Sequence, residues 1–223
     1  MSERAGARFL AVIDDFLLLW THIDIHTMNE RKLYLGIPLS GKLSTRLAQG
    51  ISKWGSLPMF PTRPENLFVT VLFLGFVTDE HAVEIAEKAE AVCAEFEPFD
   101  LMFDTIELAP AEGPTKMIQL VGEESPQLLA LRNALERDLA GKKVDGKRFR
   151  PRVTLAQVKR AEFPLLPEEK LAMFPQTVSL AEPVSSILLL ESIGAGAKRQ
   201  YLSMDEFPLG RYDQHSTDND QQE

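Results

Sequence analysis

The sequence predicts an α+β fold made of two similar lobes around a central cleft. Two short segments echo each other, at residues 68–71 (Phe-Val-Thr-Val) and 152–155 (Arg-Val-Thr-Leu). Each has the composition of a buried strand, and alternation along a strand places its first and third side chains on one face. The predicted elements follow the order β-α-β-α-β-β-α-β-β-β, so two β-α-β units precede further strands. This arrangement indicates an internally repeated fold.

Apolar spacing and turn residues define the elements of the first half. A strand is predicted after Met28, and apolar residues four apart then predict a helix. Prolines at 58, 61 and 64 predict a loop, and a run of Leu, Phe, Val and Thr predicts a buried strand that Gly75 closes. Thr78 is the expected N-cap of the next helix. The predicted elements are a strand at 32–37, a helix at 41–54, a strand at 66–73 and a helix at 78–96.

The second half follows the same logic. Ser125-Pro126 opens a helix whose leucines at 128, 131, 135 and 139 share one face. A proline-rich connection that contains Pro164, Pro167 and Pro175 then leads to the strand predicted from Val184. The predicted strands are 99–108, 117–121, 148–157, 184–191 and 200–204.

Composition bounds the class of protein. The chain has 223 residues and a formal net charge of −9, which fits one domain or two lobes packed as one. That charge argues against a protein that coats DNA or RNA non-specifically. Its single cysteine, Cys93, allows no internal disulfide, so a reducing cytoplasm is expected. Cys93 lies on the apolar stripe of its helix and is predicted to be a small core side chain. We also expect a monomer.

The two ends differ from the body of the chain. An apolar run over 9–20 is interrupted by Asp14 and Asp15, which a membrane span or a signal peptide would not tolerate. Residues 1–27 are therefore expected to be either a helix docked on the body or a segment upstream of a start at Met28. Residues 28–211 form the predicted domain. Residues 212–223 lack apolar anchors and predict a disordered acidic tail.

From Arg31 onward the chain resembles the 2H phosphoesterases, specifically the RNA 2',3'-cyclic phosphodiesterases also named 2'-5' RNA ligases. The resemblance rests on an opening strand at 33–39, two motif segments at 64–75 and 149–156, and a closing hairpin at 185–209. It implies a bilobal fold, with mainly antiparallel sheets and outer helices, in which one motif strand from each lobe faces a shared cleft. The family motif is His-x-Thr-x, present twice. Its histidines would transfer protons and its threonines would bind phosphate oxygens, a chemistry that suits histidine near neutral pH.

This sequence departs from that motif at both histidine positions. Phe68 and Arg152 stand there, while Thr70 and Thr154 remain. Phenylalanine carries no exchangeable proton, and arginine stays protonated, so neither can act as a general acid or base. A positioned acid or base contributes about 10²–10⁴ in rate, so the loss of both predicts the loss of most hydrolysis.

The replacements have two readings each. Arg152 belongs to a basic run with Arg150 and, with the two threonines, could hold an anion; it could also pair with an acidic neighbour. Phe68 could stack on a base, or it could simply fill the cleft. Other histidines are at 22, 26, 81 and 215, and the first two have a spacing that is only weak evidence for a metal. No metal or cofactor is predicted.

Three hypotheses follow. The favoured one is a degenerate family member that binds a nucleotide or RNA-end phosphate without hydrolysing it. The second is an active RNA 2',3'-cyclic phosphodiesterase with relocated catalytic groups, for which His22 or His26 would have to lie across the cleft. The third is a scaffold that uses the apolar 9–20 segment for contacts with a partner.

Overall fold

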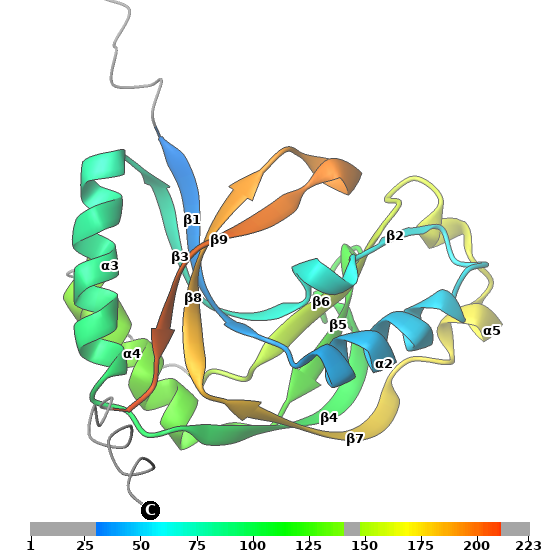
Figure 1. Ribbon diagram of the computed structural model, residues 1–223. Coiled ribbons are helices and arrows are strands. Elements are labelled where there is room, and N and C mark those ends of the chain that lie inside the picture. Colours follow the sequence, from blue (N-terminus) through cyan, green and yellow to red (C-terminus); the bar gives the residue numbers. More distant parts are fainter. Residues whose placement is uncertain (1–29, 141–147, 211–223) are drawn as a thin grey trace, which may run out of the picture.

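The computed structural model describes residues 30–140 and 148–210, and within them one antiparallel sheet runs through the whole molecule (Figure 1). Its strand order is β7-β4-β5-β6-β3-β1-β8-β9, with β2 added on β6. The strands are β1 (Arg31–Pro38), β2 (Met59–Pro61), β3 (Phe68–Val77), β4 (Phe99–Ala109), β5 (Met117–Gly122), β6 (Arg152–Val158), β7 (Gln176–Val184), β8 (Ser186–Ile193) and β9 (Gln200–Pro208).

The sheet is narrowest in its middle, between β3 and β6. There a single registered pair, Val69 with Val153, joins the two strands. On one side of this junction lie β3, β1, β8 and β9, and on the other lie β6, β5, β4 and β7. Two lobes, one of four strands and one of four strands plus β2, therefore share one sheet, and the predicted α+β bilobal fold is confirmed.

Two helices pack on one lobe and a third contacts the other lobe. They are α2 (Gly41–Ser52), α3 (Asp79–Cys93), α4 (Pro126–Ala140) and the short α5 (Glu168–Leu171). Helices α3 and α4 pack on each other and against strands β3, β8 and β9, whereas α2 contacts β6 of the opposite lobe (Figure 1). Their apolar stripes explain this placement, since Leu128, Leu131 and Leu135 are fully buried. Within residues 30–140 and 148–210, no helix covers the other face of the β3-β1-β8-β9 lobe (Figure 1).

Local sequence sets the helix starts. The side chains of Ser40 and Thr78 accept hydrogen bonds from the backbone N–H groups of Leu43 and His81, at 3.3 and 3.4 Å. The predicted N-cap at Thr78 is thus confirmed. Cys93 is fully buried, as predicted, and burial raises the pKa of its thiol to about 12.

The prediction was wrong at several element boundaries. Gly75 does not close β3, because the strand continues to Val77 through a bulge in which Gly75 adopts a φ of 93°. Strand β2 pairs with β6 in a segment predicted as a loop, with Pro61 at its last position. Strand β7 and helix α5 lie in the stretch assigned to an irregular connection. Strand β6 begins at Arg152 rather than at 148, and α3 ends at Cys93.

Among the described residues, no helix is long and apolar enough to cross a membrane. The predicted extension 1–27 and the predicted tail 212–223 lie outside the residues that the structure describes, as does the apolar 9–20 segment.

Candidate functional site

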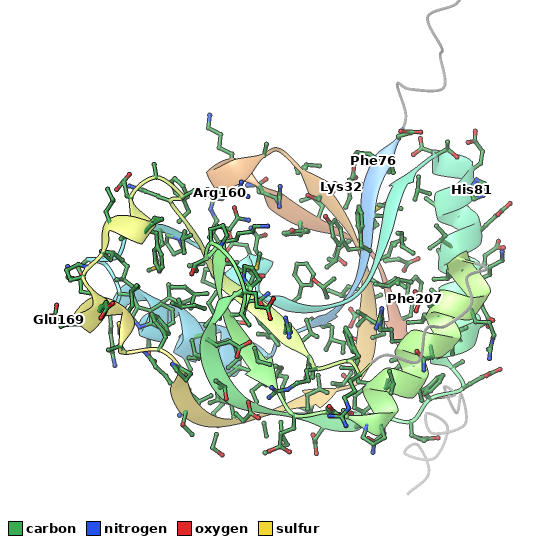
Figure 2. All side chains as sticks on the ribbon, turned by 180° about the vertical axis from the view of Figure 1, so that it is seen from behind. Lys32, Phe76, His81, Arg160, Glu169 and Phe207 are labelled. Carbon is green, nitrogen blue, oxygen red and sulfur yellow. The ribbon has the colours of Figure 1, made fainter. Side chains whose placement is uncertain are left out.

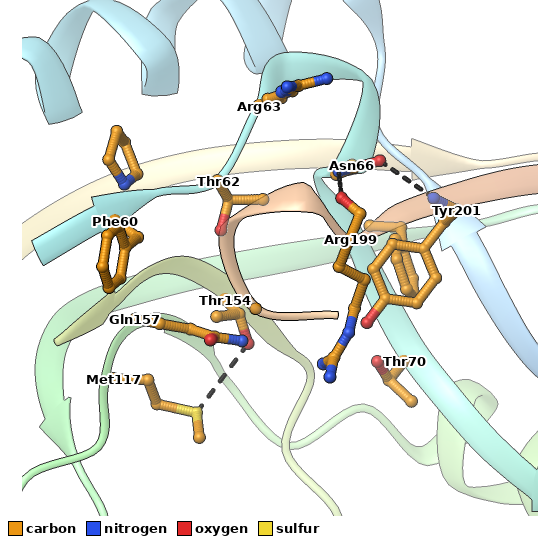
Figure 3. A pocket seen from close by; sticks show the side chains of 13 residues that line it. Phe60, Thr62, Arg63, Asn66, Thr70, Met117, Thr154, Gln157, Arg199 and Tyr201 are labelled. Atoms are coloured by element: carbon orange, nitrogen blue, oxygen red, sulfur yellow. Dashed lines mark hydrogen bonds between the residues drawn. The ribbon is translucent and has the colours of Figure 1, made fainter. Parts of the chain in front are cut away.

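A cavity of about 220 Å³ opens where the two lobes meet (Figure 3). Strands from both lobes and the closing hairpin contribute to its wall. Its lining residues are Phe60, Pro61, Thr62, Arg63, Asn66, Phe68, Thr70, Met117, Thr154, Gln157, Gly196, Arg199 and Tyr201.

The pairing of β3 with β6 brings the two motif threonines to this cavity. Val69 and Val153 are partners and both are fully buried, so the residues on either side of each valine point to the opposite face of the sheet, where Phe68, Thr70 and Thr154 line the cavity. Antiparallel register then sets position 68 across from Thr154 and position 152 across from Thr70. Both hydroxyls remain available to a ligand. That of Thr154 has only a weak contact with the thioether sulfur of Met117, at 3.9 Å.

Phe68 occupies the first motif position with its ring packed into the wall. The ring lies edge-on to Tyr201, with centroids 4.8 Å apart. It also covers Gly36, where an added Cβ would come within 2.6 Å of the Phe68 Cδ2 atom. The ring is half-buried and still lines the cavity. Phe68 therefore fills space in the wall of the cavity, whereas its stacking on a base stays a prediction.

The closing hairpin delivers a guanidinium to the cavity. The chain before β9 carries Arg199, whose side chain extends toward the space between Thr154 and Thr70 (Figure 3). Its Nε atom is buried and has no hydrogen-bond partner among the described residues. A buried, unsatisfied donor on a cation is costly unless a ligand accepts from it, so this atom marks a position for an anionic oxygen.

Asn66 fixes the position of this guanidinium. It ends the 3₁₀ turn η2 (Pro64–Asn66), and its side chain is nearly buried. Its Nδ2 donates to the Arg199 carbonyl at 3.0 Å, and its Oδ1 accepts from the Tyr201 N–H at 3.2 Å. This two-sided clamp ties the start of β9 to the segment that leads into β3, so Tyr201 is held against Phe68 and Arg199 is held at the cavity.

The charge of the lining is entirely positive. Arg63 lies at the rim and Arg199 reaches inward (Figure 3). The described residues that line the cavity include no carboxylate, imidazole, thiol or lysine. The arrangement can therefore bind an anion through hydroxyl and guanidinium donors, but it offers neither a metal-binding set nor an imidazole or carboxyl to transfer protons.

The two arginines proposed from the sequence lie elsewhere. Arg150 donates from Nε to the Gly122 carbonyl at 2.6 Å and from a terminal nitrogen to Asp104 at 2.8 Å, so its guanidinium ties β4 and β5 to the start of β6. It does not line the cavity. Arg152 is exposed and is also absent from the lining, and none of the described acidic residues pairs with it.

The histidines give the cavity no imidazole within the described residues. His81 lies in the first turn of α3 with its side chain 71% exposed, and it lines a separate hollow beside β3 and α4. His22, His26 and His215 fall outside the described residues.

Sequence reasoning missed Asn66, Arg199, Tyr201, Arg63 and Gln157. Asn66 precedes a motif strand, Arg199 directly precedes β9 and Tyr201 lies at the start of β9, so all three are distant in sequence from the second motif. Two features of the sequence could have indicated these residues. One is a polar residue just before a buried strand, and the other is an arginine after the glycines of the 194–196 loop.

An antiparallel bilobal sheet that sets two threonine-bearing motif strands against one cavity is the architecture of the 2H phosphoesterases. Solved structures agree with this fold. A Thermus thermophilus protein superposes with a TM-score of 0.68 at 23% identity, over 81% of this chain and 99% of its own. E. coli LigT, crystallised with 3'-AMP, superposes with a TM-score of 0.63 at 21% identity, over 81% of this chain and 99% of its own.

Sequence comparison identifies the family. The 2'-5' RNA ligase superfamily matches residues 59–192, and the chain belongs to this superfamily. An Aeropyrum pernix RNA 2',3'-cyclic phosphodiesterase is 32% identical over 157 residues, which are 69% of this chain and 86% of that protein. An Archaeoglobus fulgidus RNA 2',3'-cyclic phosphodiesterase is 33% identical over 100 residues, which are 44% of this chain and about half of that protein (54%).

Proposed function

We propose that this protein is a degenerate member of its superfamily, which binds the phosphate of a nucleotide or RNA end in the cavity and lacks histidine-based hydrolysis. The observation that carries the proposal is the composition of the lining. Two threonines and two arginines surround the space, and the described residues that line it include no carboxylate or imidazole. Donors without proton carriers suit binding of phosphate better than turnover.

The contacts of a bound phosphate follow from the positions of these donors. Thr70 and Thr154 would each donate a hydroxyl hydrogen bond, and the unpaired Arg199 Nε would donate a charge-assisted one. A hydrogen bond to a charged group is worth about 1.5–3 kcal/mol, so three of them suffice for a specific site. LigT has been crystallised with 3'-AMP, with phosphate and with ATP, which supports this class of ligand.

A second candidate is an active RNA 2',3'-cyclic phosphodiesterase that uses relocated groups. The retained threonines and the activity named for the Aeropyrum relative favour it. Against it stands the identity of the motif residues, since Phe68 packs on Tyr201 and cannot exchange a proton.

The test combines binding and turnover on the purified chain. We expect adenosine 3'-phosphate to bind, as measured by calorimetry. The Arg199→Gln and the double Thr70→Ala/Thr154→Ala variants should weaken its affinity by about 10-fold or more, since each removes donors worth over 1 kcal/mol. Arg137→Gln is the matched control, because Arg137 is an exposed arginine that pairs with Asp138 on α4. Unchanged affinity in both cavity variants would exclude this cavity as the site.

The catalytic question is settled with adenosine 2',3'-cyclic phosphate. Wild type should hydrolyse it near the background rate, whereas Phe68→His/Arg152→His should gain activity by about 10²-fold or more, because it restores a proton carrier on each motif strand. Wild-type turnover equal to that of a histidine-bearing relative would instead establish the second candidate.

A further inference from the structure

Aromatic side chains from β1, β3 and β9 form a row that leads away from the cavity. We call Phe68, Tyr201, Tyr34, Phe73 and Phe76 the aromatic row. Phe68 contacts Tyr201 at 4.8 Å between centroids, Tyr201 contacts Tyr34 at 5.6 Å, and Tyr34 contacts Phe73 at 4.7 Å. The inner members are half-buried, but Phe73 and Phe76 are 51% and 66% exposed. The row therefore becomes more accessible with distance from the cavity.

The bulge in β3 is what completes the row. Residues 73 and 76 are an odd number apart and would point to opposite faces of a regular strand. Here Phe73 pairs with Tyr34 and Phe76 pairs with Lys32, two residues apart on β1, because β3 contains an extra residue next to Gly75. The φ of 93° at Gly75 suits glycine and few other residues. The local backbone thus places both exposed rings on the face that continues from the cavity.

A cation lies among the outer rings. The Lys32 ammonium is 5.9 Å from the Tyr34 centroid, 5.5 Å from that of Phe73 and 5.9 Å from that of Phe76. Figure 2 shows Lys32 and Phe76 near the end of the sheet where β1 begins. No carboxylate among the described residues forms an ion pair with Lys32, so its charge is available to an anionic partner in addition to the rings.

We propose that the aromatic row and Lys32 form a track for single-stranded RNA, which binds the nucleotides that precede a terminal phosphate seated in the cavity. This inference rests on the proposed function, since the cavity fixes where the strand ends. A row of rings on one face of the sheet, with a cation beside it, suits a chain that alternates bases and phosphates. The base faces stack on the rings, and a backbone phosphate pairs with Lys32.

A protein partner is the competing occupant of an exposed aromatic face. Continuity with the positive cavity favours RNA, because the inner end of the row lies against the Arg199 site. A purely apolar contact would gain nothing from a central ammonium, whose desolvation is costly without an anion.

The experiment compares a mononucleotide with an oligonucleotide that has the same end. The probes are adenosine 3'-phosphate and a tetra-adenylate with a 3'-phosphate, and their dissociation constants are measured for wild type, Phe73→Ala/Phe76→Ala and Lys32→Gln. Leu165→Ala and Lys53→Gln are the matched controls, because both side chains are exposed on the other lobe. Removal of one stacking ring lowers affinity by about 5- to 150-fold per base.

We expect wild type to bind the tetranucleotide at least about 10-fold more tightly than the mononucleotide. The double phenylalanine variant should lose that advantage while it binds the mononucleotide as wild type does. Lys32→Gln should reduce the salt dependence of tetranucleotide binding by a slope of about 0.7. The control variants should behave as wild type for both probes.

The outcomes separate the two proposals. Equal affinity of wild type for both probes, or full oligonucleotide affinity in Phe73→Ala/Phe76→Ala, overturns the track even if the mononucleotide binds. Failure of the mononucleotide to bind, with phenylalanine-dependent binding of the tetranucleotide, overturns the cavity proposal and leaves the track. Light scattering measures the mass in solution. If the phenylalanine variant changes that mass but leaves RNA affinity unchanged, the face that carries the aromatic row is a contact between copies of this chain.

Discussion

Replacing Gly36 by alanine should destabilise the protein only while the Phe68 ring is present. Gly36 lies in β1 beneath that ring, and its φ is not positive, so the backbone itself accepts alanine. The added Cβ would meet Phe68 Cδ2 at 2.6 Å and Phe68 Cε2 at 3.1 Å, well inside the optimum carbon separation of about 3.5–4.0 Å. The aromatic ring at the motif position therefore determines whether residue 36 can carry a side chain.

The expected magnitude combines two opposing effects. Overpacking of this kind costs about 1–3 kcal/mol, whereas the lower entropy of the unfolded chain returns about 0.4–1 kcal/mol for Gly→Ala. The free energy of unfolding should fall by about 1–2 kcal/mol, which lowers Tm by about 2–8 °C for a chain of this size. In a Phe68→Ala background the two ring atoms are gone and the next neighbour is the flexible Leu190 Cδ1, at 3.1 Å, so the same substitution should be neutral or slightly stabilising.

Urea unfolding of the four proteins of this double-mutant cycle measures the coupling, which should be about 1–3 kcal/mol. Gly50→Ala is the control, because a Cβ there meets nothing within 4 Å and the residue is inside α2. That variant should gain about 0.5–1 kcal/mol. Equal destabilisation by Gly36→Ala in both backgrounds would refute the placement of the Phe68 ring over Gly36.

Three further predictions concern other contacts. Arg150→Gln should lower the free energy of unfolding by about 1–2 kcal/mol in urea titration, since the pair with Asp104 is partly exposed; no loss would mean that the clamp on β6 is unimportant. Asn66→Ala should cost about 1–3 kcal/mol and also weaken binding of adenosine 3'-phosphate by calorimetry, because it frees the segment that carries Arg199; intact binding would contradict the positioning role. Cys93 should react with iodoacetamide at pH 8 only as fast as the protein unfolds. Because burial raises the pKa of this thiol to about 12, the unfolded state loses the proton first, so stability should fall above about pH 8.5, a decline that Cys93→Ala lacks.

The parts of the fold that local patterns could predict were those with periodicity. The stripe of α3 and the buried run of β3 are determined by neighbours in sequence, and their existence was predicted correctly. Strand β2 could not be predicted from local sequence, because a three-residue segment that contains Pro61 is typical of a loop. It forms a strand only because it pairs with β6, which is distant in the sequence. The end of β3 was also misplaced, because Gly75 marks a bulge as readily as a turn.

The residues of the candidate site were likewise predictable from local sequence only in part. The two threonines and Phe68 were predicted to share the cleft because strand alternation places them on one face, and all three line the cavity. Arg199 could not be foreseen, because its approach depends on a clamp from Asn66, which is 133 residues away in the chain. Arg150 was favoured as a ligand for its charge alone, and only the fold places Asp104 beside it. A sequence shows which residues carry a charge, but only their positions in the fold decide which of them can bind a ligand.

Binding and hydrolysis of a phosphodiester share their anion donors and differ in proton transfer. In this cavity the donors come from two threonines and a hairpin arginine, and the motif positions that would carry protons hold a ring and an exposed guanidinium. Interactions that hold substrate and product equally lower both ground states and do not accelerate the step between them. If the proposed function holds, the protein should therefore bind a 3'-phosphate end and a 2',3'-cyclic end with similar affinity. Hydrolysis of the cyclic form well above the background rate would instead indicate donors that bind the transition state more tightly than the ground states.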